Sequence, residues 1–290
     1  MRTKTIKTKI IDGKKMAVDI EQALQKEIAT FARKPGMAVI LVGDNPASLI
    51  YVNHKKKAAE RIGIEAQIYH LSPIMTQDAL IAFIKELNEN ETVDGIIVQL
   101  PLPKHFDENA VIEAISPDKD IDGLHCLNMG QLFIGRPNLV PCTPLACLAL
   151  LKSVCKNRVG KNVVVVGRSR LVGKPLVQLL LDEQCTVTQA HSKTKHLSKI
   201  CQNADIIVSA TGHAGLISKK HVKRGAILID VGIIRTDSKK IVGDIVFEDM
   251  IGHAKAITPV PGGVGPMTVA MLLSNVVKAY KKNFLQIPRI

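Results

Sequence analysis

Short apolar runs rich in β-branched residues alternate along most of the chain with longer amphipathic segments. The apolar runs predict strands at residues 37–43, 64–71, 94–100, 162–167, 186–190, 205–212, 226–232 and 255–260. The segments between them have the length and apolar spacing of helices, among them residues 12–31, 47–62, 77–87 and 174–181. Because this alternation is typical of βαβ units, the sequence predicts an α/β fold built on parallel sheets.

The chain of 290 residues is long enough for two domains. Residues 116–143 are rich in proline and glycine and predict a loop region between them, after which CTPLACLALLKSVC predicts a bridging helix with Pro144 in its first turn. We expect a C-terminal helix to pack on the first domain through one apolar face, formed by Val269, Leu272, Leu273, Val276, Val277 and Tyr280. The expected domains are residues 1–141 plus 270–290, and residues 142–269.

Basic residues outnumber acidic ones, with 39 Lys and Arg against 26 Asp and Glu. This excess suits nucleic acid, a membrane surface or an anionic small molecule. With no Trp, three Tyr and six Phe, the chain offers few rings on which bases can stack. A polyanionic substrate or cofactor is the favoured interpretation, and an ordinary charged surface is the alternative.

Several classes of protein have little support. No run approaches the roughly 18 apolar residues of a membrane span, and the N-terminal MRTKTIKTKI lacks the apolar core of a secretory signal. The six cysteines form no CxxC pair and the nine histidines form no HExxH motif. We therefore expect a cytoplasmic enzyme or binding protein with reduced cysteines and no metal site.

A glycine-containing turn follows the strand at 162–167, in the segment VVVVGRSRLVGKPLVQLLL. A strand, a tight turn and a helix start can place a pyrophosphate against helix N-terminal amides. The spacing is Gly167-x-Ser169-x3-Gly173 and not GxGxxG, so the turn by itself fits a nucleotide loop and a purely structural turn about equally well.

The next predicted strand favours NADP over NAD. NAD sites usually carry a carboxylate roughly 20 residues beyond the loop, to hold the ribose 2′-hydroxyl. Here the strand runs into HSKTK, residues 191–195, which contains no acid. Its hydroxyls and cations suit a 2′-phosphate, which Arg168 in the loop can also reach. An exposed polar turn remains the alternative for Lys193 and Lys195.

In the first half, the segment YVNHKKKAAERIG contains three consecutive lysines. On a helix, Tyr51 and Lys55 share a face, whereas Lys56 and Lys57 are turned roughly 100° and 200° away. If the shared face lines a cleft, the Tyr51 ring and the Lys55 amine lie side by side in it. If the shared face points into water, the segment is a solvated basic helix, and most lysines in proteins are exposed in this way.

Polar residues also stand where parallel-sheet proteins bind ligands. Gln99 ends an apolar strand and is followed by Pro101, and ligands bind at the carboxyl ends of such strands. Asp120 and Asp122 lie on a glycine-containing loop, where an Asx-turn is the alternative to a binding role. The segment TPVPGGVGPMT lets backbone approach a flat ligand closely, or it is simply a rigid loop before the last helix.

Taken together, these motifs resemble those of the bifunctional methylenetetrahydrofolate dehydrogenase/methenyltetrahydrofolate cyclohydrolase family. The matching segments are YVNHKKKAAERIGI, VDGIIVQLPLP, PDKDIDGLHCLNMGQL, PCTP, VVVVGRSRLVGKP, ADIIVSATG, GAILIDVGI and ITPVPGGVGPMTVAMLL. They follow the family's order and spacing over nearly the whole chain, and the last is the most specific. One departure is Ala146, where the family usually has glycine two residues after PCTP.

The resemblance implies a folate-binding catalytic first domain and a Rossmann-like second domain that binds NADP, with the active site between them. It implies oxidation of 5,10-methylenetetrahydrofolate to 5,10-methenyltetrahydrofolate with NADP, and hydrolysis of that product to 10-formyltetrahydrofolate. It also implies a cytoplasmic homodimer of one-carbon metabolism and purine biosynthesis. The partners would be tetrahydrofolate derivatives, polyglutamylated forms included, and neither nucleic acid nor a membrane.

By position, the resemblance implies that Lys55 is the catalytic lysine, Tyr51 stacks on the folate, Gln99 bonds near the lysine and Asp122 holds the pterin edge. It assigns Pro261 and Gly262 to the folate site. The residues that it assigns to the dinucleotide site are Gly167, Arg168, Ser169, Ser192 and Ile233, with Arg168 and Ser192 at the 2′-phosphate.

A lysine can remove a proton from water only in its neutral form. We expect a bound cation, partial burial, and the charges of Lys56 and Lys57 to favour that form of Lys55. Two alternatives stay open: an NADP-dependent binding or regulatory protein of this fold without cyclohydrolase chemistry, and an NADP dehydrogenase for another substrate. A binding or regulatory protein would not need Lys55. A dehydrogenase for another substrate would need an acid–base pair that the sequence does not offer.

Overall fold

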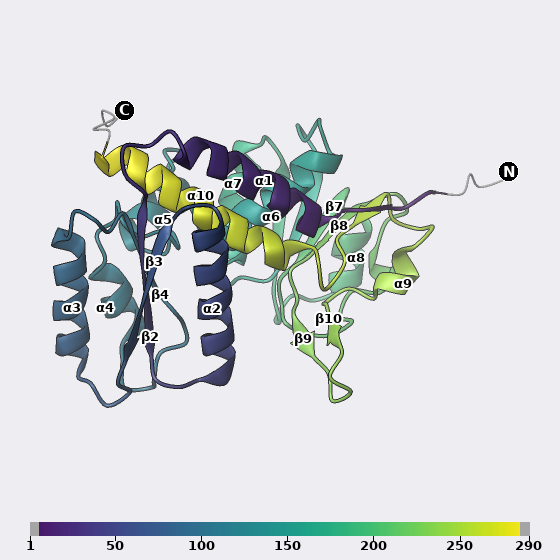
Figure 1. Cartoon of the computed structure of the whole chain (residues 1–290). Coiled ribbons are helices and arrows are strands. Elements are labelled where there is room, and N and C mark those ends of the chain that lie inside the picture. The colour runs from purple at the N-terminus through teal and green to yellow at the C-terminus, as the bar shows by residue number, and fades with distance from the viewer. Residues whose placement is uncertain (1–5, 285–290) are drawn as a thin grey trace, which may run out of the picture. The chain divides into compact units, whose positions relative to one another are not determined.

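The computed structural model describes residues 6–284, which form two compact units (Figure 1). The six-stranded unit contains residues 6–17 and Thr143–Thr268, and the three-stranded unit contains Val18–Cys142 and residues 269–284. This division differs from the expected domains at the N-terminus. Residues 6–17 cluster with the second half of the chain because strand β1 (Lys9–Ile10) pairs in parallel with β11 (Ala256–Ile257).

The three-stranded unit is built around a parallel sheet of order β3-β2-β4. Its strands are β2 (Gly36–Val42), β3 (Glu65–Leu71) and β4 (Gly95–Val98). Every residue of the central strand β2 is buried, so both faces of the sheet must be covered. The predicted strands at 37–43, 64–71 and 94–100 are therefore confirmed, with ends shifted by one or two residues.

Alternate residues of β2 point into two different apolar clusters, as the two-residue period of a strand requires. Ala38, Ile40 and Val42 pack with apolar residues of α3 (Gln77–Glu89) and α4 (Glu108–Glu113). Met37, Val39 and Leu41 pack with those of α1 (Gly13–Ile28), α2 (Pro46–Arg61) and α10 (Val264–Phe284). Figure 1 shows α3 and α4 on one side of the sheet and α2 on the other.

The last helix, α10, packs as predicted. Leu272, Leu273, Val276 and Val277 belong to the same apolar cluster as β2, and Tyr280 is fully buried. The Tyr280 ring stacks on Phe31, with 4.5 Å between the ring centroids. Within residues 6–284, no helix is long and apolar enough to cross a membrane.

The proline- and glycine-rich stretch 116–143 is less irregular than expected. It contains helix α5 (Cys126–Phe133), which begins where His125 Nδ1 accepts a hydrogen bond from the Leu127 amide at 3.1 Å. A histidine cap and eight residues with an internal glycine give a weak sequence signal. The helix predicted at the end of this stretch is confirmed as α6 (Cys142–Val154), with Pro144 in its first turn and Ala146 fully buried.

The six-stranded unit has the parallel sheet order β1-β11-β8-β7-β5-β6. Besides β1 and β11, the sheet contains β5 (Asn162–Val166), the edge strand β6 (Thr186–Ala190), β7 (Ile206–Ser209) and β8 (Ile227–Asp230). After α6, the helices of this unit are α7 (Gly173–Asp182), α8 (Leu197–Gln202) and α9 (Phe247–Met250). The short strand β9 (Ile234–Arg235) pairs only with β10 (Ile241–Val242) among the described strands. The chain leaves β5 for β6 and then crosses to β7 on the other side of β5. Such a reversal of strand order is where open parallel sheets bind ligands.

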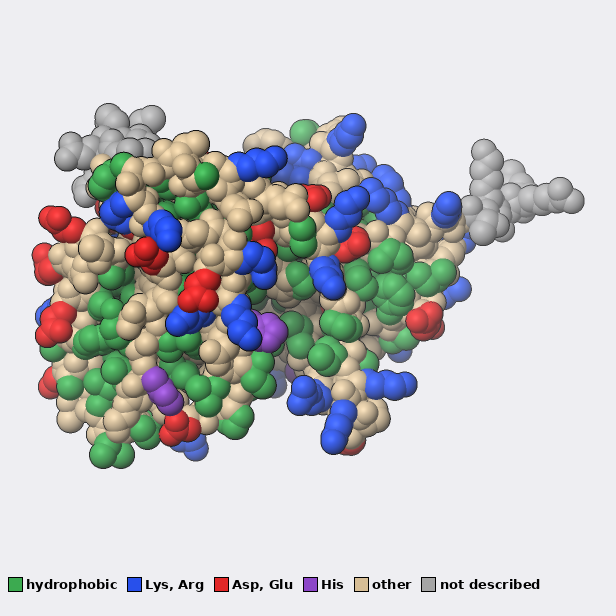
Figure 2. Space-filling model, in the orientation of Figure 1, with side chains coloured by type: hydrophobic (Ala, Val, Ile, Leu, Met, Phe, Trp, Pro, Cys, Tyr) green, Lys and Arg blue, Asp and Glu red, His purple; other side chains and the backbone are tan. Residues whose placement is uncertain are grey.

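Basic side chains are spread over the face of the molecule seen in Figure 2. The figure shows Lys and Arg side chains on the visible face of each unit, interspersed with acidic and apolar ones. On this face, the basic side chains are therefore not confined to one element.

Candidate active site

Helix α2 of the three-stranded unit presents Lys55 to Gln99. The helix starts at Pro46 and is capped by Asn45, whose side chain accepts from the amides of Ala47 and Ser48. The Lys55 ammonium donates to Gln99 Oε1 at 3.0 Å. Gln99 follows β4 directly, and its Nε2 donates to the Leu100 carbonyl at 2.7 Å. The glutamine amide is thus held at both ends, and its oxygen faces the lysine.

The other two lysines lie elsewhere on α2, as the helical spacing predicted. Lys56 forms an ion pair with Glu60 one turn later, at 3.7 Å, and Lys57 is exposed. Tyr51, one turn before Lys55, leaves half of its surface exposed to solvent. The ring is therefore accessible for stacking, and only Lys55 of the three lysines reaches Gln99.

The charges of Asp122 and Lys55 both affect the pKa of the buried Cys142 thiol. Burial raises the pKa of Cys142 well above its ordinary value; the Asp122 carboxylate raises it further, and the Lys55 ammonium opposes this rise. The thiol donates to the Ile121 carbonyl, with 3.4 Å between Sγ and oxygen. Of the predicted residues, Lys55 and Gln99 come together through their hydrogen bond. Asp122 directly follows Ile121, whose carbonyl accepts from the Cys142 thiol. Cys142 was not among the predicted site residues.

The structure separates the two aspartates of the loop. Asp120 is almost fully buried and accepts hydrogen bonds from the His125 amide at 2.8 Å and from Asn128 Nδ2 at 2.9 Å. Burial raises the pKa of the Asp120 carboxyl. Asp122 is only half-buried, so Asp120 shapes the loop and Asp122 remains accessible.

Asn275 of α10 fixes the backbone just before Asp122 and Cys142. Its buried Nδ2 donates to the Ile121 carbonyl at 2.8 Å and to the Val140 carbonyl at 2.9 Å. The residue was not predicted from the sequence, although a polar side chain between the apolar positions Leu273 and Val276 is a signal. A buried amide that satisfies two backbone carbonyls positions the residues that follow them.

The turn after β5 in the six-stranded unit leaves no room for side chains at its two glycines. A Cβ on Gly167 would lie 2.4 Å from the Ala210 oxygen, and one on Gly173 would lie 2.2 Å from the Gly167 oxygen. Gly167 also has φ of 131°, a conformation that favours glycine. Ser169 Oγ accepts from the amides of Val172 at 3.1 Å and Gly173 at 3.4 Å, which orders the start of α7.

The turn after β6 lies beside this glycine turn, because β5 and β6 are neighbours and parallel. Thr194 Oγ1 accepts from the His191 amide at 2.9 Å, which leaves Ser192 and Lys193 exposed at the tip. Arg168 is exposed on the glycine turn, and no acid occurs between Gln189 and Lys195. This edge can therefore accept an additional phosphate.

Two buried aspartates that were not predicted hold the loops after β7 and β8. Asp244 accepts from Ser209 Oγ at 2.8 Å, from the Thr211 amide at 2.7 Å and from the His213 amide at 3.0 Å. Asp230 accepts from the amides of Gly232 at 2.9 Å, Asp244 at 3.0 Å and Ile245 at 2.8 Å. The predicted Ile233 follows this network directly and is half exposed.

Pro261 and Gly262 lie in the six-stranded unit, after β11 and before α10. Gly262 has φ of 107°, and its carbonyl accepts from the Lys14 amide at 3.0 Å. The segment is thereby joined to the start of α1. The predicted folate residues are thus divided between the two units, since Tyr51, Lys55, Gln99 and Asp122 belong to the other.

The fold and these sites define a two-unit α/β protein with a dinucleotide-type loop in one unit and a lysine–glutamine pair in the other. The model of the tetrahydrofolate dehydrogenase/cyclohydrolase catalytic domain matches residues 11–122, and that of the NAD(P)-binding domain of the same enzymes matches residues 141–284. The chain belongs to the tetrahydrofolate dehydrogenase/cyclohydrolase family.

Curated relatives and solved structures agree with this assignment. The bifunctional protein FolD of Listeria innocua is 51% identical over 276 residues, which cover 94% of this chain and 97% of that protein. The crystal structure of the bifunctional enzyme FolD of Campylobacter jejuni has a TM-score of 0.93 at 44% identity and covers 95% of this chain and 99% of its own. The Trypanosoma brucei enzyme, complexed with NADP and an inhibitor, has a TM-score of 0.90 at 40% identity, covering 95% and 98%.

Because the Asp230 carboxyl is buried, we expect the stability of the fold to decrease as the pH rises. Burial raises its pKa from 3.8 to about 6. A pKa that is higher in the folded state stabilises the fold fully below about pH 4, and this contribution is lost as the pH rises through about 6. Relative to Asp230→Asn, the wild-type free energy of unfolding should fall by roughly 3 kcal/mol over this range. Urea unfolding at a series of pH values measures the difference, and parallel curves for the two proteins would contradict the assignment.

Proposed function

We propose that the chain catalyses both reactions of its family. It oxidises 5,10-methylenetetrahydrofolate to 5,10-methenyltetrahydrofolate with NADP, and it hydrolyses the methenyl compound to 10-formyltetrahydrofolate. The observation that carries this proposal is the Lys55–Gln99 hydrogen bond at 3.0 Å in the unit that matches the catalytic domain. A dehydrogenase alone needs orientation of its substrate, whereas the hydrolysis also needs a group that accepts a proton.

The residues at the edge of the six-stranded sheet fit NADP. Gly167 and Gly173 keep the turn free of side chains, and the amides at the start of α7 favour a phosphate. Arg168 and Ser192 would bind the 2′-phosphate, and Ser169 and Ile233 would contact the rest of the dinucleotide. When bound, NADP accepts the hydride that leaves the methylene carbon of the folate.

In the hydrolysis, a water molecule adds to the methenyl carbon. The neutral amine of Lys55 takes a proton from this water, and Gln99 Oε1 holds the amine in place without adding a charge. The bond between the carbon and N5 then breaks, the adduct hydroxyl loses its proton as N5 gains one, and the formyl group remains on N10. The overall reaction consumes one water and releases one proton.

Four further residues bind the folate in this proposal. Asp122 accepts hydrogen bonds from the pterin edge, and its half-buried position leaves it accessible. Tyr51 stacks on the ring system with its exposed face. Pro261 and Gly262 supply backbone that approaches the flat ligand closely.

Replacing Lys55 should separate the two activities. In Lys55→Met the proton acceptor is lost, so we expect cyclohydrolase turnover to fall by about 10²-fold or more. The Kd for NADP should stay within about twofold of the wild-type value, because Lys55 is not part of the dinucleotide site. The absorbance of methenyltetrahydrofolate reports the first quantity, and titration calorimetry the second.

Lys85→Met is the matched control, because it removes the same charge from an exposed position of α3 in the same unit. It should retain both activities. Robust hydrolysis by Lys55→Met would refute the role of the lysine. A folded wild-type protein that binds NADP and turns over neither folate would instead indicate a binding or regulatory protein.

Replacing Arg168 should reduce the preference for NADP. In Arg168→Gln, a charge-assisted hydrogen bond to the 2′-phosphate is lost, so we expect kcat/KM for NADP to fall about tenfold or more while that for NAD changes little. The rate of reduced-cofactor formation at 340 nm gives both values. Lys219→Gln, at an exposed position of the same unit, is the control. An unchanged preference in Arg168→Gln would exclude this arginine from the 2′-phosphate site.

We also propose a homodimer, the state implied by the family resemblance. The β9–β10 hairpin supports it: two strands by themselves are marginally stable in water, and Ile241 leaves 37% of its surface exposed there. A second copy of the chain could cover such an edge. Light scattering after size-exclusion chromatography should give about twice the chain mass of 31.5 kDa. A single species of 31.5 kDa would contradict the dimer.

A further inference from the structure

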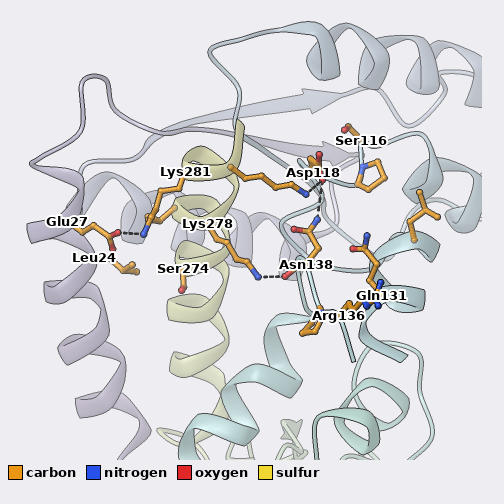
Figure 3. A pocket seen from close by; sticks show the side chains of 15 residues that line it. Leu24, Glu27, Ser116, Asp118, Gln131, Arg136, Asn138, Ser274, Lys278 and Lys281 are labelled. Carbon is orange, nitrogen blue, oxygen red and sulfur yellow. Dashed lines mark hydrogen bonds and ion pairs between the residues drawn. The ribbon is translucent and has the colours of Figure 1, made fainter. Parts of the chain in front are cut away.

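A cavity lies in the three-stranded unit and contains none of the residues assigned to catalysis. It has a volume of about 650 Å³ and lies between the last turns of α10, helix α1 and the segments around Asp118 and Arg136 (Figure 3). Four basic side chains line it against two carboxylates: Arg136, Lys278, Lys281 and Lys282 against Glu27 and Asp118. Its volume is within the usual range of small-molecule sites.

The lysines of the cavity differ in their partners. Lys281 pairs with Glu27 at 2.6 Å, and Lys282 pairs with Asp118 at 2.5 Å. Lys278 donates instead to the backbone carbonyl of Asn138, and no carboxylate within residues 6–284 forms an ion pair with it. Figure 3 shows the Lys281–Glu27 and Lys278–Asn138 contacts at the cavity. One ammonium of the cavity is therefore without a counter-charge among the described residues.

The environment of Lys278 makes this missing counter-charge costly. Burial lowers its pKa, and the neighbouring Lys282 lowers it further. A partly desolvated ammonium that bonds only to a neutral carbonyl is stabilised by an anion in the same space. Arg136 contributes a second cation from a different element, since it follows α5 and is exposed.

Neutral groups in the lining complete a site for oxygen-rich anions. The hydroxyls of Ser116 and Ser274 and the amide of Gln131 can each donate a hydrogen bond. Figure 3 shows Gln131 and Arg136 close together at one side of the cavity and Ser274 near Lys278 at the other. An anion with several acceptor oxygens can use donors from both sides.

A purely structural role does not account for the whole cluster. Cations at a helix C-terminus interact favourably with the helix dipole, which explains Lys281 and Lys282 in the last turn of α10. Lys278 lies further from this end, and Arg136 is not on the helix.

We propose that this cavity binds a small phosphate-bearing molecule, with Lys278 and Arg136 as its principal contacts. Phosphate provides two charges and several acceptor oxygens, which match two cations and the surrounding neutral donors. The site is separate from the dinucleotide loop, which belongs to the other unit. The proposal does not depend on the reaction that the chain catalyses.

Titration calorimetry with inorganic pyrophosphate tests the proposal. Saturating NADP is present throughout, so that the dinucleotide site is filled. The wild-type protein should bind pyrophosphate at one site, and Lys278→Gln and Arg136→Gln should each weaken this binding about tenfold. Lys85→Gln, which removes a charge from an exposed position of α3 in the same unit, should leave the affinity unchanged.

Two results would overturn the proposal. Equal affinities for Lys278→Gln, Arg136→Gln and Lys85→Gln would show that pyrophosphate responds only to the overall positive charge. Citrate binding as tightly as pyrophosphate, with the same loss in the variants, would assign the site to carboxylates and not to phosphates. Thermal unfolding checks that each variant is folded, and Arg136→Gln keeps the test valid even if Lys278→Gln destabilises α10.

Discussion

Burial of parallel strands on both faces is the constraint on which the remaining structure depends. In β2, alternate residues face different apolar clusters, so this strand leaves no face for a polar site. Polar groups that the sheets contribute to a site are therefore expected at the carboxyl ends of strands and in the loops that follow. Gln99 follows β4, Gly167 follows β5 and Ser192 follows β6. The sites lie where the packed sheets permit polar atoms.

Buried polar groups give these loops their shape. Asp120, Asp244 and Asn275 are almost completely buried, and each accepts or donates at least two hydrogen bonds. Removing one partner would leave an unsatisfied group in the interior, which is costly, so the loops are held in one arrangement. Asp122 can stay partly accessible because Asp120 and Asn275 hold the backbone of its loop.

Much of the fold was predictable because strand runs and helix periods are local properties of the sequence. The strand at residues 186–190 and the apolar face of α10 were predicted correctly, and the special spacing around Gly167 was visible as a motif. The short elements α5 and β1 were not. Helix α5 has a histidine cap and an internal glycine, and β1 has two residues whose pairing with β11 spans more than 240 positions of the chain. Neither leaves a local pattern.

The sequence by itself determined the residue types that can carry chemistry and which of three adjacent lysines shares a helix face with Tyr51, because helical geometry acts over a few residues. Only the tertiary structure decided that Lys55 meets Gln99, 44 positions away, and that residues 6–17 join the sheet of the second half of the chain. It also decided that Asn275 holds the backbone beside Asp122. Such contacts depend on long-range packing, in which the partner of a polar group is set by the fold and not by its neighbours in sequence.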